Sequence, residues 1–117
     1  METKSALLAL AALAQHARLS VFRTLVQAGP AGLAAGRIAE LTGIHPSSLS
    51  FHLKELAHAD LVASRQDGRF VIYTARFGTM NSLIGFLTDN CCGGNPCGPA
   101  EAACASHAAA QPEEIIR

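Results

Sequence analysis

Four cysteines gather near the end of this 117-residue chain, at Cys91, Cys92, Cys97 and Cys104. Thiolates are soft ligands, and three of them without a neighbouring carboxylate or histidine suit a thiophilic ion better than magnesium, calcium or manganese. Trivalent arsenic and antimony bind three sulfurs because a lone pair occupies the fourth direction. The pair Cys91-Cys92 and the thiol of Cys97 therefore predict a site for As(III) or Sb(III), with no organic cofactor.

Other chemistries stay open for the same thiols. Zinc would need a fourth ligand, which Cys104 or His107 could supply, although the chain contains no CxxC pair of the usual zinc spacing. Cys91 and Cys97 could instead be the attacking and resolving thiols of a small redox protein, or form a disulfide that senses oxidation. Buried, inert cysteines are the last alternative. Because no βαβ pattern accompanies the thiols, we expect a regulator without catalytic residues and not an enzyme.

The composition indicates a single small domain. Half of the residues are hydrophobic but only 5% are aromatic, so the core should be aliphatic and largely helical. The formal net charge is zero, yet residues 15–80 carry seven Lys or Arg against four Asp or Glu, a charge of +3 that would attract nucleic acid weakly. The clustered cysteines staple no distant parts of a fold, which indicates thiols of the cytoplasm. The apolar run 6–14 is too short to cross a membrane, so we expect no membrane partner.

A helix near the middle of the chain is the element that a nucleic acid would contact. Pro46 suits its first position, and Gly43 would end a preceding helix at 36–42, so the two form a helix-turn-helix. Three leucines recur at helical spacing and would face a core: Leu49, Leu53 and Leu56. The outward faces carry hydroxyls, an imidazole and an aromatic edge that could meet a thymine methyl group in the major groove: Ser47, Ser48, Phe51 and His52.

A β-hairpin follows this helix directly. Residues 61–65 and 69–74 are rich in β-branched and aromatic types, and Asp67-Gly68 between them predicts a two-residue type I′ turn with Arg69 beside the tip. A helix-turn-helix followed by such a hairpin predicts a winged helix, whose wing contacts the DNA backbone or the minor groove. The expected fold is therefore mainly α with a small β-hairpin. A bare helical bundle with a solvated turn is the alternative.

The remaining helices predict a dimer. The first, at 5–14, is apolar on nearly every face, so it has to be buried on more than one side. The second, at 17–28, has an apolar face for the core and a polar face for solvent. In the last, at 78–90, an apolar stripe reaches Cys91 as its next step. We expect the first and last helices to meet their symmetry mates. The winged-helix domain should cover residues 1–92, followed by an alanine-rich, cysteine-containing tail at 93–117.

These segments resemble the ArsR/SmtB family of winged-helix metalloregulatory repressors. The matching stretches cover most of the chain, and the SxHLxxL core within them is specific: RLSVFRTL at 18–25, RIAELTGIHPSSLSFHLKEL at 37–56 and LVASRQDGRFVIYTA at 61–75. The resemblance implies a homodimer that represses transcription on a palindromic operator until a toxic ion binds. It also implies DNA contacts at Ser47, Ser48, Ser50 and His52, with Arg69 at the wing.

The chain departs from the family pattern where many members bind their ion. Many arsenical members carry an ELCVCDL-type motif at the start of the recognition helix, where this chain has no cysteine. Zinc-sensing members place paired Asp and His ligands on the last helix, where this chain has Asp89 alone. Cys91, Cys92 and Cys97 therefore look like an independently placed arsenite site. We expect a cytoplasmic, dimeric repressor that releases double-stranded operator DNA when As(III) or Sb(III) joins the three thiols.

Overall fold

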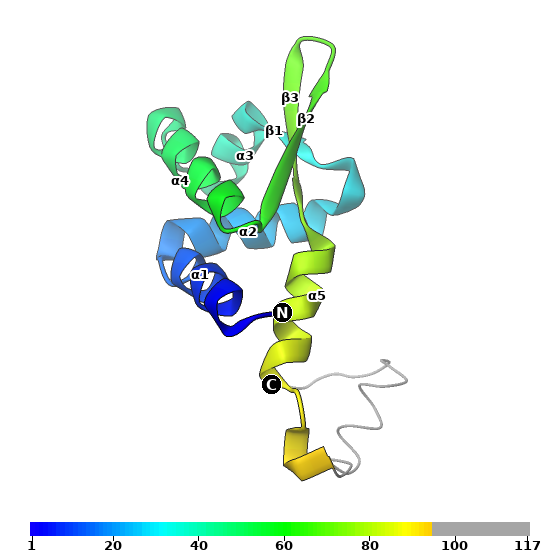
Figure 1. The fold of residues 1–117 in the computed structure, drawn as a ribbon. Helices are drawn as coiled ribbons and strands as arrows, with labels where there is room; N and C mark the ends of the chain where they lie inside the picture. Colours follow the sequence, from blue (N-terminus) through cyan, green and yellow to red (C-terminus); the bar gives the residue numbers. More distant parts are fainter. Residues whose placement is uncertain (95–117) are drawn as a thin grey trace. The chain divides into compact units, whose positions relative to one another are not determined.

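The computed structural model describes residues 1–94, so Cys97, Cys104 and all but the first two residues of the predicted tail lie outside the described residues. The chain divides into two units, Met1–Phe86 and Leu87–Arg117. The first unit is mainly helical with a small sheet, as predicted (Figure 1). The helices and strands are α1 (Thr3–Leu13), α2 (His16–Ala28), β1 (Leu33–Ala34), α3 (Ala35–Thr42), α4 (Pro46–His58), β2 (Val62–Asp67), β3 (Phe70–Ala75) and α5 (Phe77–Leu87), with short 3-10 turns at Gly29–Ala31 and Cys91–Gly94.

Local signals set the boundary between α3 and α4. α3 ends at Gly43, whose φ of 73° is the left-handed conformation that glycine adopts at little cost. α4 begins with Pro46 in its first turn, after His45, whose ring nitrogen Nδ1 accepts a hydrogen bond from the backbone N–H of Ser47 at 3.2 Å. The predicted helix-turn-helix is confirmed.

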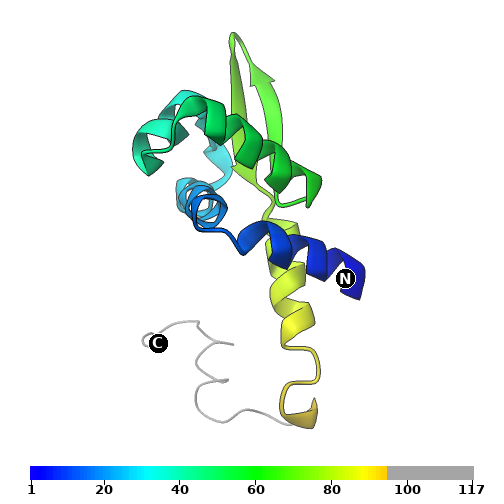
Figure 2. The ribbon, with the colours of Figure 1, turned by 90° about the vertical axis from the view of Figure 1, so that its left-hand side faces the viewer.

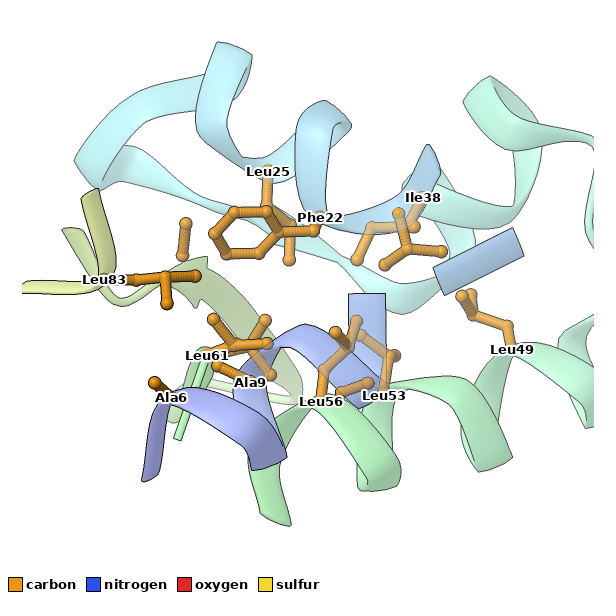
Figure 3. Close-up of a cluster of buried hydrophobic side chains, with 14 residues drawn as sticks. Ala6, Ala9, Phe22, Leu25, Ile38, Leu49, Leu53, Leu56, Leu61 and Leu83 are labelled. Carbon is orange, nitrogen blue, oxygen red and sulfur yellow. The ribbon is translucent and has the colours of Figure 1, made fainter. Parts of the chain in front are cut away.

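α2 is the central helix of the first unit. It contacts α1, α3, α4 and β3 (Figure 1 and Figure 2), and its Val21, Phe22 and Leu25 are buried. Fully burying a leucine-sized side chain stabilises a fold by about 1.5–3 kcal/mol, so the shared core fixes how α4 packs on α2. The side chains that surround those of α2 come from the other α-helices and from the residue just before β2 (Figure 3): Ala6, Ala9, Ile38, Leu49, Leu53, Leu56, Leu61 and Leu83.

α1 packs on this core through alanines. Ala6, Ala9 and Ala12 recur at one-turn spacing and are buried, whereas Leu7 is 61% exposed and Leu8 is 49% exposed. Short side chains allow a helix to approach its neighbour closely. α1 therefore turns Leu7, Leu8 and Leu10 outward, which leaves apolar surface exposed on the single chain.

Within residues 1–94, no single helix has both the length and the apolar character needed to cross a membrane. α1 and the segment His16–Ala31 meet that test only as a pair, and a bend of 102° separates them.

The sheet has three antiparallel strands in the order β1-β3-β2, one strand more than the sequence predicted. β1 lies between the helices predicted at 17–28 and 36–42, where no strand was predicted, and its two residues pair with Tyr73 and Ile72 of β3. Gly32, just before β1, has a φ of 72°, and a Cβ atom there would lie 2.5 Å from the carbonyl oxygen of Tyr73. A two-residue strand is too short for an alternating pattern to reveal it.

The hairpin turn is displaced by one residue from its predicted position. β2 and β3 remain paired up to Asp67 and Phe70, so the turn consists of Gly68 and Arg69. Gly68 has a φ of 63°, whereas Asp67 and Arg69 have no positive φ. A positive φ at the first central residue alone is typical of a type II′ turn, so the predicted type I′ turn at Asp67-Gly68 is wrong. Arg69 lies in the tip itself.

α5 is shorter than predicted. It ends at Leu87 instead of Asn90, and Asn90 has a left-handed φ of 57° that stops a helical path. Cys91 therefore does not continue the apolar stripe of the helix but opens the 3-10 turn Cys91–Gly94. The expectation that the apolar stripe of this helix reaches Cys91 is wrong.

Candidate nucleic-acid interface and cysteine cluster

α4 presents one continuous exposed face. Its members follow the i, i+3, i+4, i+7 and i+11 spacing of a helix, and all are exposed. The opposite side of the helix is anchored in the core by Leu49, Leu53 and Leu56. A helix of this kind, carrying polar groups along an exposed face, can enter the major groove of B-DNA. The outer face of α4 consists of Ser47, Ser50, Phe51, Lys54 and His58.

Local hydrogen bonds orient two of the serines predicted to contact DNA. The Ser50 hydroxyl donates to the backbone carbonyl of Pro46 at 3.2 Å, so its oxygen is left to accept a hydrogen bond from a base amino group. The Ser47 hydroxyl lies 2.9 Å from Nδ1 of His45. Ser48 is exposed on the same first turn of the helix. All three serines are therefore accessible to a partner.

His52 does not lie on an outward face. Its side chain is only 8% exposed, and its Nδ1 has no hydrogen-bond partner among the described residues. The expected placement is wrong because position 52 follows Leu49 by three residues and precedes Leu56 by four, which puts it on the buried side of the helix. The ring instead meets that of Phe51 edge to face, with ring centroids 5.7 Å apart. A DNA contact of His52 stays a prediction.

The hairpin carries Arg69 at its tip, as the wing of a winged helix requires. The hairpin projects beyond the helices in both views (Figure 1 and Figure 2), and Arg69 is exposed. A second arginine of the hairpin, Arg65, donates to the backbone carbonyl of Ala31 at 2.8 Å and ties β2 to the turn before β1. Arg65 therefore stabilises the hairpin, and Arg69 is the cation that the tip presents.

Lys54 of the outer face was not among the predicted DNA contacts, and Phe51 was predicted only as an aromatic edge that could meet a thymine methyl group. Lys54 is exposed one turn beyond Ser50, a position from which an ammonium group can reach phosphate. Phe51 is 56% exposed in the middle of the face. The signal for both was their helical spacing, because 51 and 54 are the next positions on the face that Ser47 and Ser50 begin.

A polar junction joins the end of α4 to the start of α5. Asp60, two residues after α4, accepts a hydrogen bond from the hydroxyl of Thr79 at 3.2 Å and pairs with Nε of Arg76 at 3.1 Å. Asp60 also has a φ of 64°, which few non-glycine residues adopt. The next residue, Leu61, is fully buried. The junction therefore links the helix that carries the outer face to the first turn of α5.

Cys91 and Cys92 form a close pair of thiols. Their sulfur atoms lie 3.7 Å apart, and both residues are exposed. Adjacent residues of a regular helix point about 100° apart, so this convergence depends on the left-handed backbone of Cys92, with a φ of 56°. Two sulfurs bound to one ion by tetrahedral bonds of about 2.3 Å would be about 3.8 Å apart. The pair therefore has the spacing of two ligands of one thiophilic ion.

The third predicted ligand, Cys97, lies outside the described residues. Within residues 1–94, no three His, Cys, Asp or Glu side chains are grouped closely enough to hold a metal ion. The described part of the chain therefore brings together two of the three thiols that were predicted as ligands.

The helix-turn-helix, the hairpin and the exposed face of α4 define the class of the molecule, a winged-helix DNA-binding protein. A sequence model described as a helix-turn-helix domain matches residues 13–65. Over 77 residues the chain is 35% identical to the uncharacterized HTH-type transcriptional regulator YceK of Bacillus subtilis, a match that covers 65% of this chain and 76% of that protein. The chain belongs to the helix-turn-helix transcriptional regulators.

Other relatives agree with this assignment. The chain is 31% identical over 80 residues to the nodulation protein NolR of Rhizobium meliloti, covering 68% of this chain and 63% of that protein, so it spans less than two thirds of that relative. An ArsR-like transcriptional regulator from Rhodococcus sp. RHA1 has a TM-score of 0.65 and 25% identity over 72% of this chain and 76% of its own.

A homodimeric neighbour completes the comparison. It is the homodimeric winged helix-turn-helix DNA-binding domain of Mb0332 from Mycobacterium bovis, a possible ArsR-family transcriptional regulator. Its TM-score is 0.59 and its identity is 26%, over 74% of this chain and 81% of its own. The predicted winged helix-turn-helix fold is thereby confirmed, and the neighbours of this fold include ArsR-like transcriptional regulators.

Proposed function

We propose that this chain is a homodimeric repressor that binds double-stranded operator DNA and releases it when As(III) or Sb(III) binds Cys91, Cys92 and Cys97. α4 would enter the major groove while the hairpin contacts the backbone or the neighbouring minor groove. The observation that carries the choice of ligand is the separation of 3.7 Å between two exposed cysteine sulfurs. Such a repressor acts in the cytoplasm and needs no organic cofactor.

Exposed side chains on α4 and on the wing support DNA binding. The hydroxyls of Ser48 and Ser50 can bond base edges, and Arg69 can contact phosphate or reach into the minor groove. The formal charge of residues 15–80 is only +3, so a single subunit would bind the phosphate backbone weakly. A dimer doubles these contacts and reads two half-sites about one helical turn apart.

Exposed apolar side chains support the homodimer. Leu7, Leu8 and Leu10 of α1 are 61%, 49% and 39% exposed, and Ile84 of α5 is 53% exposed. Burial of such side chains against a second copy would contribute about 25 cal/mol for each Å² of apolar surface removed from water. A symmetric contact through α1 and α5 would place the helix that precedes the cysteines at the subunit interface.

α5 offers a route from the cysteines to the DNA-reading helix. It ends at Leu87, four residues before Cys91, while Asp60 ties its first turn to the end of α4. Drawing three sulfurs onto one ion would constrain the segment that follows α5. A shift of α5 would then be passed to α4 through Asp60. Operator affinity has to fall by about 1–3 kcal/mol for a coupling of the usual size.

Arsenite-dependent release of DNA tests the proposal. The probe is labelled DNA from upstream of the protein's own gene, and fluorescence anisotropy follows its release as sodium arsenite is added under reducing conditions. We expect the wild type to release the DNA, and Cys97→Ser to retain it over the same range because only two sulfurs remain. Cys104→Ser is the matched control and should respond like the wild type. Equal responses of the wild type and Cys97→Ser would show that the assigned site is wrong.

The same assay separates the competing roles of the thiols. Release by hydrogen peroxide that a thiol reductant reverses, with no response to arsenite, would indicate a redox-sensing regulator. Release by zinc that a chelator reverses would indicate a zinc-responsive repressor. Turnover of a disulfide substrate without DNA binding would indicate a small redox enzyme.

A further inference from the structure

An exposed phenyl ring interrupts the otherwise polar outer face of α4. Phe51 is 56% exposed, and the members of the face on either side of it are serines, a lysine and a histidine. Single exposed apolar side chains are common on protein surfaces. This one, however, lies between groups that can bond bases and phosphate, at a position that meets base edges when a recognition helix enters the major groove.

The ring of His52 packs against this ring. The two ring centroids are 5.7 Å apart and the planes are inclined at 64°, the edge-to-face arrangement that aromatic pairs prefer. His52 is itself only 8% exposed, on the side of the helix that buries Leu49 and Leu56, so it provides a fixed surface. A side chain that is already oriented loses less conformational entropy when a partner binds. The Phe51 ring is therefore pre-oriented for a contact outside the molecule.

The geometry points to Phe51 as the residue that recognises thymine in the operator, with His52 as its positioning residue. A phenyl ring has no hydrogen-bonding group, and the apolar feature that base edges display in the major groove is the C5-methyl group of thymine. A ring in the middle of the outer face would therefore favour thymine over the other bases. This inference rests on the proposed DNA-binding function and adds the base that is read and the side chain that reads it.

Replacement of thymine by uracil tests this assignment, because uracil lacks the methyl group and keeps every hydrogen-bonding group of thymine. The probe is a duplex that the wild type selects from a random-sequence pool, prepared once with thymidine and once with deoxyuridine. We expect the wild type to bind the deoxyuridine duplex more weakly, by about fourfold for each methyl group that the ring covers. Phe51→Ala should bind both duplexes equally, and Phe51→Leu should keep part of the preference.

Phe70→Ala is the matched control. Phe70 is 63% exposed, but it lies on the hairpin, at the first residue of β3. The minor groove and the backbone do not display the methyl group of thymine, so a wing variant should keep the wild-type preference. His52→Ala should weaken the preference and His52→Phe, which restores an aromatic edge, should recover it. Circular dichroism identifies any His52 variant that fails to fold. In that case Phe51→Ala alone tests the recognition of thymine by Phe51.

The outcomes distinguish this assignment from the function on which it rests. Equal binding of the two duplexes by the wild type, or a full preference in Phe51→Ala, would overturn the reading of thymine by Phe51 and leave the DNA-binding function intact. An unchanged preference in a folded His52→Ala would overturn the positioning role. If the wild type selects no sequence from the pool, sequence-specific DNA binding fails, and the reading of thymine fails with it.

Discussion

The two arginines of the hairpin have different roles. Arg65 donates to the backbone carbonyls of Ala31 and Pro30 and so fixes the base of the hairpin, whereas Arg69 lies in the exposed tip. Only a cation that faces the DNA can displace the counterions that surround phosphate groups. In the proposed dimer, the tip of the hairpin would therefore contribute one such cation from each subunit.

Arg69→Ala should weaken operator binding and reduce its dependence on salt. Loss of one phosphate contact from each subunit of a dimer should lower the slope of log K against log salt by about 1.8, since each contact contributes about 0.9. Anisotropy titrations at several potassium chloride concentrations measure this slope. Arg23→Ala, which removes an exposed arginine of α2, is the control. Equal slopes for the two variants would exclude a specific phosphate contact at the wing.

At the scale of elements, the sheet depends on a close approach of two backbones at Gly32. A Cβ atom there would lie 2.5 Å from the carbonyl oxygen of Tyr73 and 2.6 Å from Cγ2 of Thr74, and the φ of 72° disfavours any other residue. β1 can pair with β3 only because this space is empty. Glycine is thus required where α3 and its preceding strand join the hairpin.

Gly32→Ala should lower the free energy of unfolding by about 2 kcal/mol or more, because both the contact and the backbone conformation become unfavourable. Gly36→Ala is the control, since a Cβ atom at that position in α3 meets nothing within 4 Å. It should raise the free energy of unfolding by up to about 1 kcal/mol. Urea unfolding followed by circular dichroism measures both values. A Gly32→Ala protein as stable as the wild type would contradict the packing of β1.

The Asp60 junction should carry part of the coupling between the cysteines and α4. Asp60→Gly removes the bonds to Thr79 and Arg76 without adding strain, because glycine tolerates the φ of 64°. We expect operator affinity without arsenite to change little, while the arsenite-dependent loss of affinity shrinks by about 0.5–2 kcal/mol. Asp60→Asn keeps an acceptor for Thr79 and should retain more of the effect. Identical arsenite responses in all three proteins would place the coupling elsewhere.

The sequence predicted the elements whose signals are periodic and local. The leucines of α4, with Gly43 and Pro46 at the turn, were sufficient for the helix-turn-helix, and the hairpin was located to within one residue.

Predictions failed where the periodic pattern is interrupted, too short or outweighed by residue type. α5 ends at Leu87 and left-handed Asn90 follows it, so the apolar stripe does not continue to Cys91, and two-residue β1 is too short to show a pattern. His52 was misplaced because its type suggested the surface while its spacing put it inside.

For the whole molecule, the outward leucines of α1 are the main argument for a second copy. α1 uses alanines to pack on its own unit and leaves Leu7, Leu8 and Leu10 exposed on the single chain. Several exposed leucines on one short helix favour an interface with a partner. Two subunits would also present two copies of α4 to the two halves of a palindromic operator.

Leu8→Glu should therefore convert the dimer to a monomer at micromolar concentration, because a buried carboxylate without a partner is strongly unfavourable in an apolar contact. Sedimentation velocity measures the change, and operator affinity should fall with it. Leu19→Glu is the control, since Leu19 is 43% exposed on α2 and has a similar surface area to lose. A Leu8→Glu dimer as tight as the wild type would exclude α1 from the interface.

The central claim is that binding of arsenite at the cysteines and binding of operator DNA at α4 weaken each other. Linkage requires that operator DNA weakens arsenite binding by the same factor by which arsenite weakens operator binding, about 5- to 150-fold for a coupling of the usual size. Calorimetric titration of arsenite into the protein, with and without saturating operator duplex, measures that factor directly. If the proposed function is right, the dissociation constant for arsenite will be higher in the presence of operator DNA than in its absence. An arsenite affinity that is the same with and without DNA would contradict it.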